Sequence, residues 1–479
     1  MTVEKSYQLV IGNERMPAAS GETFGTRNPA TGNELTSVPA GRAEDVDKAV
    51  ESGREGFHTW ADIDPVERSR LLQSLSDEIL ANKDRLAELE TLDCGKPISE
   101  ARGDVESCAR YFEFYAGIAD KLRGESIPIS NDYVDFTVNE PLGVTGLIIP
   151  WNFPISMVGR SAGPALAAGN AVVVKPAEQT PLTALEIGEL AAEVGFPQGV
   201  LNVVTGFGDT AGQALSSHSD IDGISFTGSV PTGTKVAEAA AKSIVPVHLE
   251  LGGKSPIVVY PDANLDMAVE NAITGIFTSN AGQVCNAASR ALVHEDIHDR
   301  FTSELVSRVE EISIGDGMTD PDMGPLVSRG QLERVESYIE TGKTEHGDPI
   351  TGGSVLEREG HFVEPTVFDG VDNDMTIAQE EIFGPVLTVD TFEDETEAIA
   401  IANDVEYGLV AGVFTENISR AYRFARKVDA GQIYINEWFA GGVEAPFGGY
   451  KKSGYGRERG LEAVEEYMQI KNVCAKIDR

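Results

Sequence analysis

Between residues 144 and 260 the chain alternates short apolar segments with helical ones, and this alternation constrains the fold more than any other feature. Apolar strands that are joined through helices predict a parallel sheet, because each crossover places a helix against a face of the sheet. The expected strands are residues 144–149, 171–175, 200–203, 223–226 and 257–260. The expected helices are residues 155–168, 182–193, 211–216 and 233–242.

A second α/β series follows residue 285. Its expected helices are residues 298–312, 329–340 and 418–427, and its expected strands are residues 386–391, 409–414 and 431–436. No short-period repeat or low-complexity linker interrupts the chain, so we expect two α/β domains that meet near residue 250. Residues 1–60 are expected to form an approach segment with turns and a helix from Ala43. Helices from Pro65 and over residues 98–119 are expected to be framework.

The charge balance excludes several classes of partner. Acidic side chains number 77 against 38 basic ones, a net charge of −39, and this field repels nucleic acid and anionic membranes. No run of about 18 apolar residues is present, and no basic segment followed by an apolar one opens the chain. We therefore expect a cytoplasmic protein. The four cysteines form no CxxC pair and no metal-ligand spacing with the histidines, which argues against a disulfide framework or a metal site.

A single thiol, Cys285, lies among small residues between an expected helix over residues 265–278 and a short strand over residues 290–294. This setting can hold a sulfur near a turn, within reach of a substrate. A free cysteine on its own is more often a buried core residue than a nucleophile. Catalysis at Cys285 therefore requires that the rest of the chain supply a base, an oxyanion donor and a cofactor site.

Two loops at strand ends offer such groups. Asn152 follows an apolar strand and can aim its amide at an oxygen that becomes negative during a reaction; the alternative is that it caps the next helix. Glu250 lies in an apolar run before two glycines, and partial burial raises the pKa of a carboxyl toward the range of a general base. The alternative is a buried ion pair, with Lys254 as the nearest cation.

Other motifs suit a dinucleotide. Lys175 and Glu178 end a strand and can bind the hydroxyls of a ribose, and a carboxylate there disfavours a 2′-phosphate; the alternative is a surface ion pair. Of two glycine-bearing turns, the one around Ser229 is the better phosphate site, because free amides at a helix start suit an anion. Glu381 and Phe383 can reach the nicotinamide end from the second domain; the alternative is a turn acid and a core ring.

In combination and in this order, the motifs resemble the aldehyde dehydrogenase superfamily from about residue 28 to residue 473. The matching segments are residues 150–154, 175–178, 226–229, 249–256, 282–285, 380–385 and 446–449. The resemblance implies a Rossmann-like parallel-sheet NAD-binding domain, an α/β catalytic domain and a small β arm for oligomerisation. We accordingly predict an NAD-binding domain over residues 1–249 with the arm at 124–141, a catalytic domain over 250–435, and a return to the first domain with a C-terminal oligomerisation strand over 436–479.

The resemblance also implies a role for each matched residue. Cys285 resembles the nucleophile, Asn152 an oxyanion donor and Glu250 the base that activates water, with NAD as the cofactor and NADP as an alternative. Family members that transfer the acyl group to coenzyme A usually lack a carboxylate at the position of Glu250, so hydrolysis is favoured. The predicted cofactor contacts are Ile148, Trp151, Lys175, Glu178, Gly208, Gly228, Ser229, Gly233, Leu251, Glu381 and Phe383.

The substrate is expected to be a small aliphatic aldehyde or a semialdehyde, oxidised by a homodimer or homotetramer. Arg160 suits the distal carboxylate of a semialdehyde such as succinate semialdehyde; the alternative is that it pairs with an acid of the protein. The other predicted substrate contacts are Phe153, Met157, Val284, Asn286, Trp438 and Phe439; for Phe153, Met157, Trp438 and Phe439 the alternative is packing in the core. Two further classes remain open: a thiol acyl hydrolase, which requires a Cys–His pair, and a structural protein without catalysis.

Overall fold

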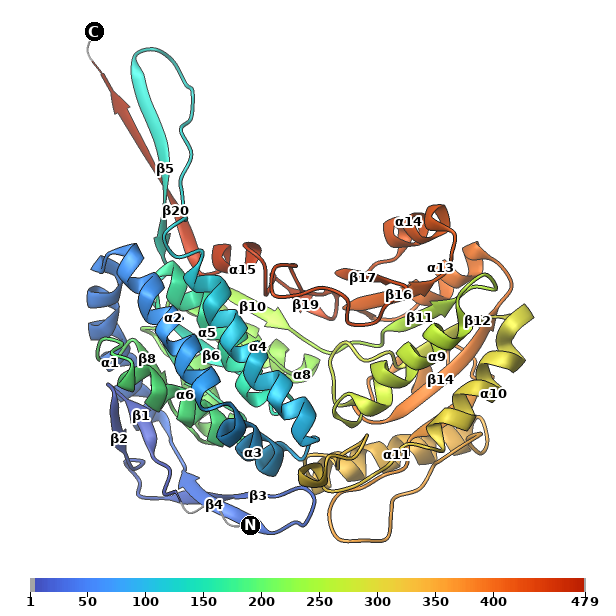
Figure 1. The fold of residues 1–479 in the computed structure, drawn as a ribbon. Helices are drawn as coiled ribbons and strands as arrows, with labels where there is room; N and C mark the ends of the chain where they lie inside the picture. The colour runs from blue at the N-terminus through green and yellow to red at the C-terminus, as the bar shows by residue number, and fades with distance from the viewer. Residues whose placement is uncertain (1–4, 478–479) are drawn as a thin grey trace.

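Two sheets organise the chain in the computed structural model, which describes residues 5–477 (Figure 1). The first sheet has the strand order β19-β10-β9-β6-β7-β8-β1-β2. Its five central strands are parallel, as the apolar alternation predicts, and the flanking pairs are antiparallel. These strands are β1 (Leu9–Ile11), β2 (Glu14–Met16), β6 (Val144–Ile148), β7 (Ala171–Lys175), β8 (Leu201–Val203), β9 (Gly223–Thr227), β10 (Val247–Glu250) and β19 (Gly454–Tyr455).

Helices pack on both faces of this sheet. The central one, α5 (Pro154–Ala168), is buried along its whole length and contacts α4 and α6, which explains why its sequence lacks a polar face. Proline at its first position fits a helix start, where the missing N–H leaves no carbonyl unpaired. The other helices are α1 (Ala43–Asp62), α2 (Pro65–Ala81), α3 (Lys83–Cys94), α4 (Ile98–Ala116), α6 (Leu182–Glu193), η1 (Gly208–Gly212), α7 (Gln213–Ser216), α8 (Val230–Ala241) and α15 (Glu462–Glu465).

The second sheet is parallel throughout, with the order β13-β14-β12-β11-β16-β17. Its strands are β11 (Pro256–Val259), β12 (Arg290–His294), β13 (Thr366–Asp369), β14 (Val386–Phe392), β16 (Val410–Phe414) and β17 (Gln432–Ile435). Its helical segments are α9 (Leu265–Ile273), η2 (Thr274–Thr278), η3 (Asn280–Gly282), η4 (Glu295–Ile297), α10 (His298–Val309), η5 (Gly317–Thr319), α11 (Arg329–Glu345), α12 (Thr376–Gln379), α13 (Glu395–Asn403) and α14 (Ile418–Lys427). The mixed α/β fold with parallel sheets is therefore confirmed.

The N-terminal segment differs from the prediction. Residues 1–60 were expected to form an approach segment with turns and a helix from Ala43, and no strand was assigned there, whereas β1 and β2 extend the first sheet and β3 (Thr23–Arg27) pairs with β4 (Glu34–Pro39). The first two have only three residues each, which is too short for a period-two pattern to emerge from the sequence. A further small pair joins β15 (Tyr407–Gly408) to β18 (Tyr450–Lys451).

An antiparallel arm projects from the body of the molecule (Figure 1). It joins β5 (Tyr133–Pro141) to β20 (Met468–Lys476), and all nine residues of each strand are paired. Val134, Phe136 and Val138 alternate along β5 and are exposed, so one face of the arm is apolar and uncovered in the single chain. Among residues 5–477, no helix has both the length and the apolar character needed to cross a bilayer.

Candidate active site

A cavity of about 1020 Å³ receives side chains from the ends of both sheets. Most of the predicted site residues line it: Asn152, Glu250, Cys285, Trp151, Gly228, Ser229, Leu251, Glu381, Phe383, Phe153, Met157, Arg160, Val284, Asn286 and Phe439. Its size is at the upper end of the range for ligand pockets. The cavity therefore brings together residues that the sequence places in six separate segments: 151–160, 228–229, 250–251, 284–286, 381–383 and 439.

Six predicted residues do not line this cavity: Ile148, Lys175, Glu178, Gly208, Gly233 and Trp438. The first five belong to β6, β7, η1 and α8 or to the turns beside them. Trp438 was predicted as a wall of the substrate tunnel. Its ring is instead buried in the core of the second sheet, and its Nε1–H donates to the Asn286 carbonyl at 3.2 Å. Trp438 thus contacts Asn286 through this hydrogen bond and does not line the cavity.

The loop that precedes Cys285 has an unusual backbone. Asn280, Ala281 and Gly282 have φ values of 43°, 53° and 73°, so three consecutive residues are left-handed. Non-glycine residues in this region cost of order 1 kcal/mol each and persist only where the surroundings impose the conformation. At Gly282 a Cβ would lie 2.4 Å from the Gly384 carbonyl oxygen, so only glycine fits there.

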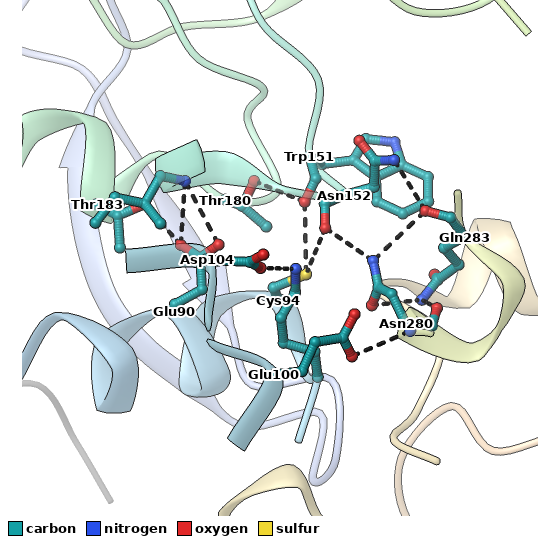
Figure 2. A network of polar contacts seen from close by, with 12 residues as sticks. Glu90, Cys94, Glu100, Asp104, Trp151, Asn152, Thr180, Thr183, Asn280 and Gln283 are labelled. Atoms are coloured by element: carbon teal, nitrogen blue, oxygen red, sulfur yellow. Dashed lines mark hydrogen bonds and ion pairs between the residues drawn. The ribbon is translucent and has the colours of Figure 1, made fainter. Parts of the chain in front are cut away.

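Amide side chains hold this loop against the Asn152 loop (Figure 2). Asn280 Nδ2 donates to the Asn152 carbonyl at 2.8 Å, and Asn152 Nδ2 donates to the Gln283 carbonyl at 2.9 Å. The backbone N–H of Asn280 donates to Glu100 Oε2 at 3.1 Å, and Gln283 Oε1 accepts from Val327 N–H at 2.9 Å. These reciprocal bonds hold the loop before Cys285 and the Asn152 loop together.

The position of Asn152 excludes the helix-capping alternative. The N-cap of α5 is Phe153, and no side chain caps that helix. Asn152 is buried at the cavity wall, and the Gln283 carbonyl takes one of its two amide hydrogens. Within residues 5–477 no second acceptor takes the other hydrogen. That N–H is therefore available to a ligand oxygen.

We expect Asn280→Ala to lower kcat/KM about tenfold or more while the protein stays folded. The substitution removes the hydrogen bond from Asn280 Nδ2 to the Asn152 carbonyl, which holds the two loops together. Steady-state kinetics and a thermal melt measure the two effects. Asn264→Ala is the matched control: it removes the amide that caps α9, outside the cavity, and should reduce stability without affecting the rate. Equal rates in the two variants would exclude a positioning role for Asn280.

The Cys285 thiol is partly exposed in the cavity, whereas Cys94 and Cys108 are fully buried. Burial raises the pKa of the Cys285 thiol to about 11, and the positive charges of Arg160 and Arg459 oppose this rise. The two arginines therefore favour the thiolate, which is the nucleophilic form.

Glu250 ends β10 and is buried. Its carboxylate lies 3.5 Å from His248 Nε2 and 3.9 Å from Arg160 Nη2, and neither of its oxygens accepts a hydrogen bond. Burial raises the pKa of Glu250 above its ordinary value, which suits a general base. Lys254, the alternative partner, does not approach it: the Lys254 ammonium is buried without a hydrogen-bond partner, and burial lowers its pKa to about 7.

Arg160 lines the cavity but is already paired. Its guanidinium forms a buried ion pair with Glu458 and lies 4.4 Å from the centre of the Phe447 ring. The structure therefore corresponds to the second of the two sequence interpretations, in which an acid of the protein holds this arginine. Glu458 was not predicted as a site residue, because its partner lies 298 positions earlier and no local pattern links them.

At the other end of the cavity, Trp151 and Phe383 meet edge to face at 5.2 Å. Glu381 Oε1 accepts from the Gly253 N–H at 3.0 Å, and a Cβ at Gly252 would lie 2.2 Å from its other oxygen. Burial raises the pKa of Glu381 to about 7. The paired glycines after Glu250 thus admit a carboxylate from the second domain beside the base, a contact that the sequence does not reveal.

Beyond this end lie Lys175 and Glu178, where β7 stops. Their side chains are 3.4 Å apart, and Lys175 is buried, which lowers the pKa of its ammonium. Ser229 occupies the N-cap position of α8, and its hydroxyl makes no cap bond to the helix backbone. The start of α8 and the buried ammonium suit an anionic ligand with hydroxyl groups, although the Thr232 and Gly233 N–H groups donate to the Ser229 carbonyl.

The whole chain is similar to known dehydrogenases. The sequence model described as the aldehyde dehydrogenase family matches residues 16–473. The Bacillus subtilis protein DhaS, which carries an aldehyde dehydrogenase name, is 47% identical over 99% of this chain and 97% of its own. A hydroxyisobutyraldehyde dehydrogenase of Mycolicibacterium austroafricanum is 46% identical over 98% of this chain and 94% of its own. The NAD⁺ complex of an aldehyde dehydrogenase from Bacillus cereus superposes with a TM-score of 0.98 at 44% identity, covering 99% of this chain and 97% of that one.

Proposed function

Because the chain belongs to the aldehyde dehydrogenase family, we propose that it oxidises an aldehyde to a carboxylic acid with NAD, through a covalent intermediate on Cys285. One observation carries this proposal: Cys285, Glu250 and Asn152 line one cavity with Trp151 and Phe383. The test is absorbance at 340 nm with NAD and a panel of aldehydes. No absorbance change with any aldehyde would contradict the proposal.

The residues present fit NAD. The buried ammonium of Lys175, the start of α8 with the Ser229 hydroxyl, and the aromatic pair at Trp151 and Phe383 would hold its ribose, pyrophosphate and nicotinamide ends. Glu178 beside Lys175 would repel the 2′-phosphate of NADP, so NAD is the preferred form. The solved NAD⁺ complex of the Bacillus cereus relative supports this choice.

The first chemical step is attack of the Cys285 thiolate on the aldehyde carbonyl, which forms a thiohemiacetal. The developing oxyanion receives the free N–H of the Asn152 amide and the backbone N–H of Cys285, which donates to no carbonyl in the described chain. Such preorganised donors typically contribute 10²–10³-fold to a rate of this kind.

Bound NAD would accept the hydride that leaves the thiohemiacetal carbon, leaving a thioester on Cys285. Glu250 then takes a proton from water, and the hydroxide attacks the thioester, releasing the acid and restoring the thiol. Its raised pKa makes Glu250 a stronger base than an exposed carboxylate. Because Glu250 can activate water, we infer that the acyl group is released by hydrolysis and is not transferred to another acceptor.

We propose small aliphatic aldehydes or semialdehydes as substrates, since Phe153, Met157, Val284 and Phe439 line the cavity with largely apolar surface. The thiol acyl hydrolase alternative has less support. Its Cys–His pair is missing from the described chain, because the cavity lining contains no histidine and His248 faces Glu250.

We propose the division of the chain into an NAD-binding domain over residues 1–249, a catalytic domain over 250–435 and a returning segment over 436–479. The connection between β10 and β11 is where the chain passes from the first sheet to the second, and β19 pairs with β10. We also place the protein in the cytoplasm, because its four cysteines are free thiols, as is usual in a reducing compartment.

The uncovered apolar face of the arm should hold the protein in a dimer or tetramer. We expect Phe136→Glu/Val138→Glu to yield monomers, because two buried carboxylates at a subunit contact are strongly unfavourable. Light scattering after size exclusion gives the mass. The control is Ile418→Glu, an exposed apolar position on α14 (59% exposed). If the double variant has the same mass as the parent, the arm does not form the subunit interface.

A further inference from the structure

Arg459 is unlike every other arginine in residues 5–477. The others either donate to an acid or a carbonyl, or lie exposed at the surface. Arg459 is half-buried, its Nε is shielded from solvent without an acceptor, and it forms no ion pair in this part of the chain. Acidic residues outnumber basic ones 77 to 38, so a partly buried cation without an acid stands out.

The Arg459 side chain lines the same cavity as Cys285. Its positive charge opposes the burial-driven rise of the pKa of Cys285 and of Tyr434, and the Tyr434 hydroxyl accepts from Asn286 Nδ2 at 3.1 Å. Arg459 therefore lies toward the Cys285 end of the cavity.

The cation is also held in place. The guanidinium of Arg459 lies 5.0 Å from the centre of the Phe447 ring, and the guanidinium of Arg160 lies 4.4 Å from the centre of the same ring. Glu458 neutralises Arg160 through their ion pair. Arg160 also lies 3.9 Å from the Glu250 carboxylate, so it has two acids beside it, whereas Arg459 forms no ion pair with any acid in the described chain.

We propose that Arg459 binds an anionic group of the substrate, so that the preferred aldehydes carry a carboxylate distal to the carbonyl. This inference rests on the proposed function. A guanidinium donates two parallel N–H···O bonds to a carboxylate, and the two terminal nitrogens of Arg459 would supply them. Arg160 can support the anion only weakly, because Glu458 already holds it.

The test compares 4-oxobutanoate with its methyl ester, which has the same reacting carbon but no charge. We expect the parent protein to have the higher kcat/KM for the anion, and Arg459→Met to lower the ratio of the two values about 10- to 100-fold, the usual range for a charge-assisted hydrogen bond. Arg459→Lys should restore part of the ratio. The ratio also cancels the effect of the lost charge on the Cys285 thiol, which acts on both substrates alike.

Arg457→Met is the matched control. It removes the same charge two residues away, where the side chain donates to the Gly449 and Gly456 carbonyls and does not line the cavity, and it should leave the ratio unchanged. A parent ratio near one, or a ratio that Arg459→Met does not change, overturns the inference while NADH formation from the ester still supports aldehyde oxidation. If neither compound yields NADH while another aldehyde of the panel does, the inference is overturned and the proposed function stands; the proposed function fails only if no aldehyde of the panel yields NADH.

Discussion

Cys285→Ala should abolish NADH formation, with a loss of at least about 10⁴-fold in kcat, because no other thiol in the described chain lines the cavity. The substitution removes one sulfur and adds no bulk, so the fold and the cofactor site should remain. Stopped-flow absorbance at 340 nm measures both the first turnover and the steady state. Binding of NADH, followed by its fluorescence, should persist.

Cys474→Ala is the control for this experiment, since Cys474 is exposed on the arm. It should show the parent rate.

In the parent, the rate of the first turnover should rise as the pH increases from 7 toward 10. Burial raises the pKa of the Cys285 thiol to about 11, so the thiolate fraction grows over this range. Residual turnover in Cys285→Ala would mean that another group attacks the aldehyde.

Glu250→Gln should separate the two halves of the reaction. We expect a first turnover that releases about one NADH per active site, followed by a steady state slower by about 10²–10⁴-fold, the usual contribution of a general base. The amide keeps the shape of the carboxyl but cannot take a proton from water. Mass spectrometry should then detect the acyl group on Cys285.

The acid side of the pH profile provides a second measurement on the same residue. Glu250 acts as a carboxylate, and burial raises its pKa, so the base form is lost at a higher pH than for an exposed glutamate. In the parent, the rate of thioester hydrolysis should therefore stay level on acidification until the pH falls through this raised pKa, whereas the rate of the first turnover declines across the whole range below pH 10 because the thiolate fraction of Cys285 falls. Loss of the first turnover in a folded Glu250→Gln protein would assign this carboxylate to an earlier step.

Much of the fold and the centre of the site could be predicted from local sequence. The buried strands are continuous apolar runs, Asn152 follows β6 and Glu250 ends β10, where the parallel strands of the first sheet all end at one edge. Each of these motifs is a short local pattern. Cys285 could be assigned only from the combination of motifs, because small residues and a turn around a free thiol do not distinguish a nucleophile from a core cysteine.

The remaining features depend on contacts between distant segments. The ion pair of Arg160 with Glu458, and the position of Arg459 over Phe447, arise only when the returning segment packs against the first domain. The left-handed backbone at Ala281 contradicts the preference of alanine, and tertiary hydrogen bonds impose it. For Trp438, position in the sequence near the predicted site indicated a substrate contact, whereas the side chain packs in the hydrophobic core of the second sheet.

The first sheet and the arm both close with strands that come from the end of the chain. β19 pairs with β10, and β20 pairs with β5 after about 300 intervening residues. During synthesis from the N-terminus, β5 therefore leaves the ribosome long before the strand that covers its edge exists. The first sheet therefore cannot be completed before the strands of the second sheet have been synthesised. Until residues 454–476 have been synthesised, β10 and β5 lack these partner strands, so the first sheet and the arm are completed only at the end of synthesis.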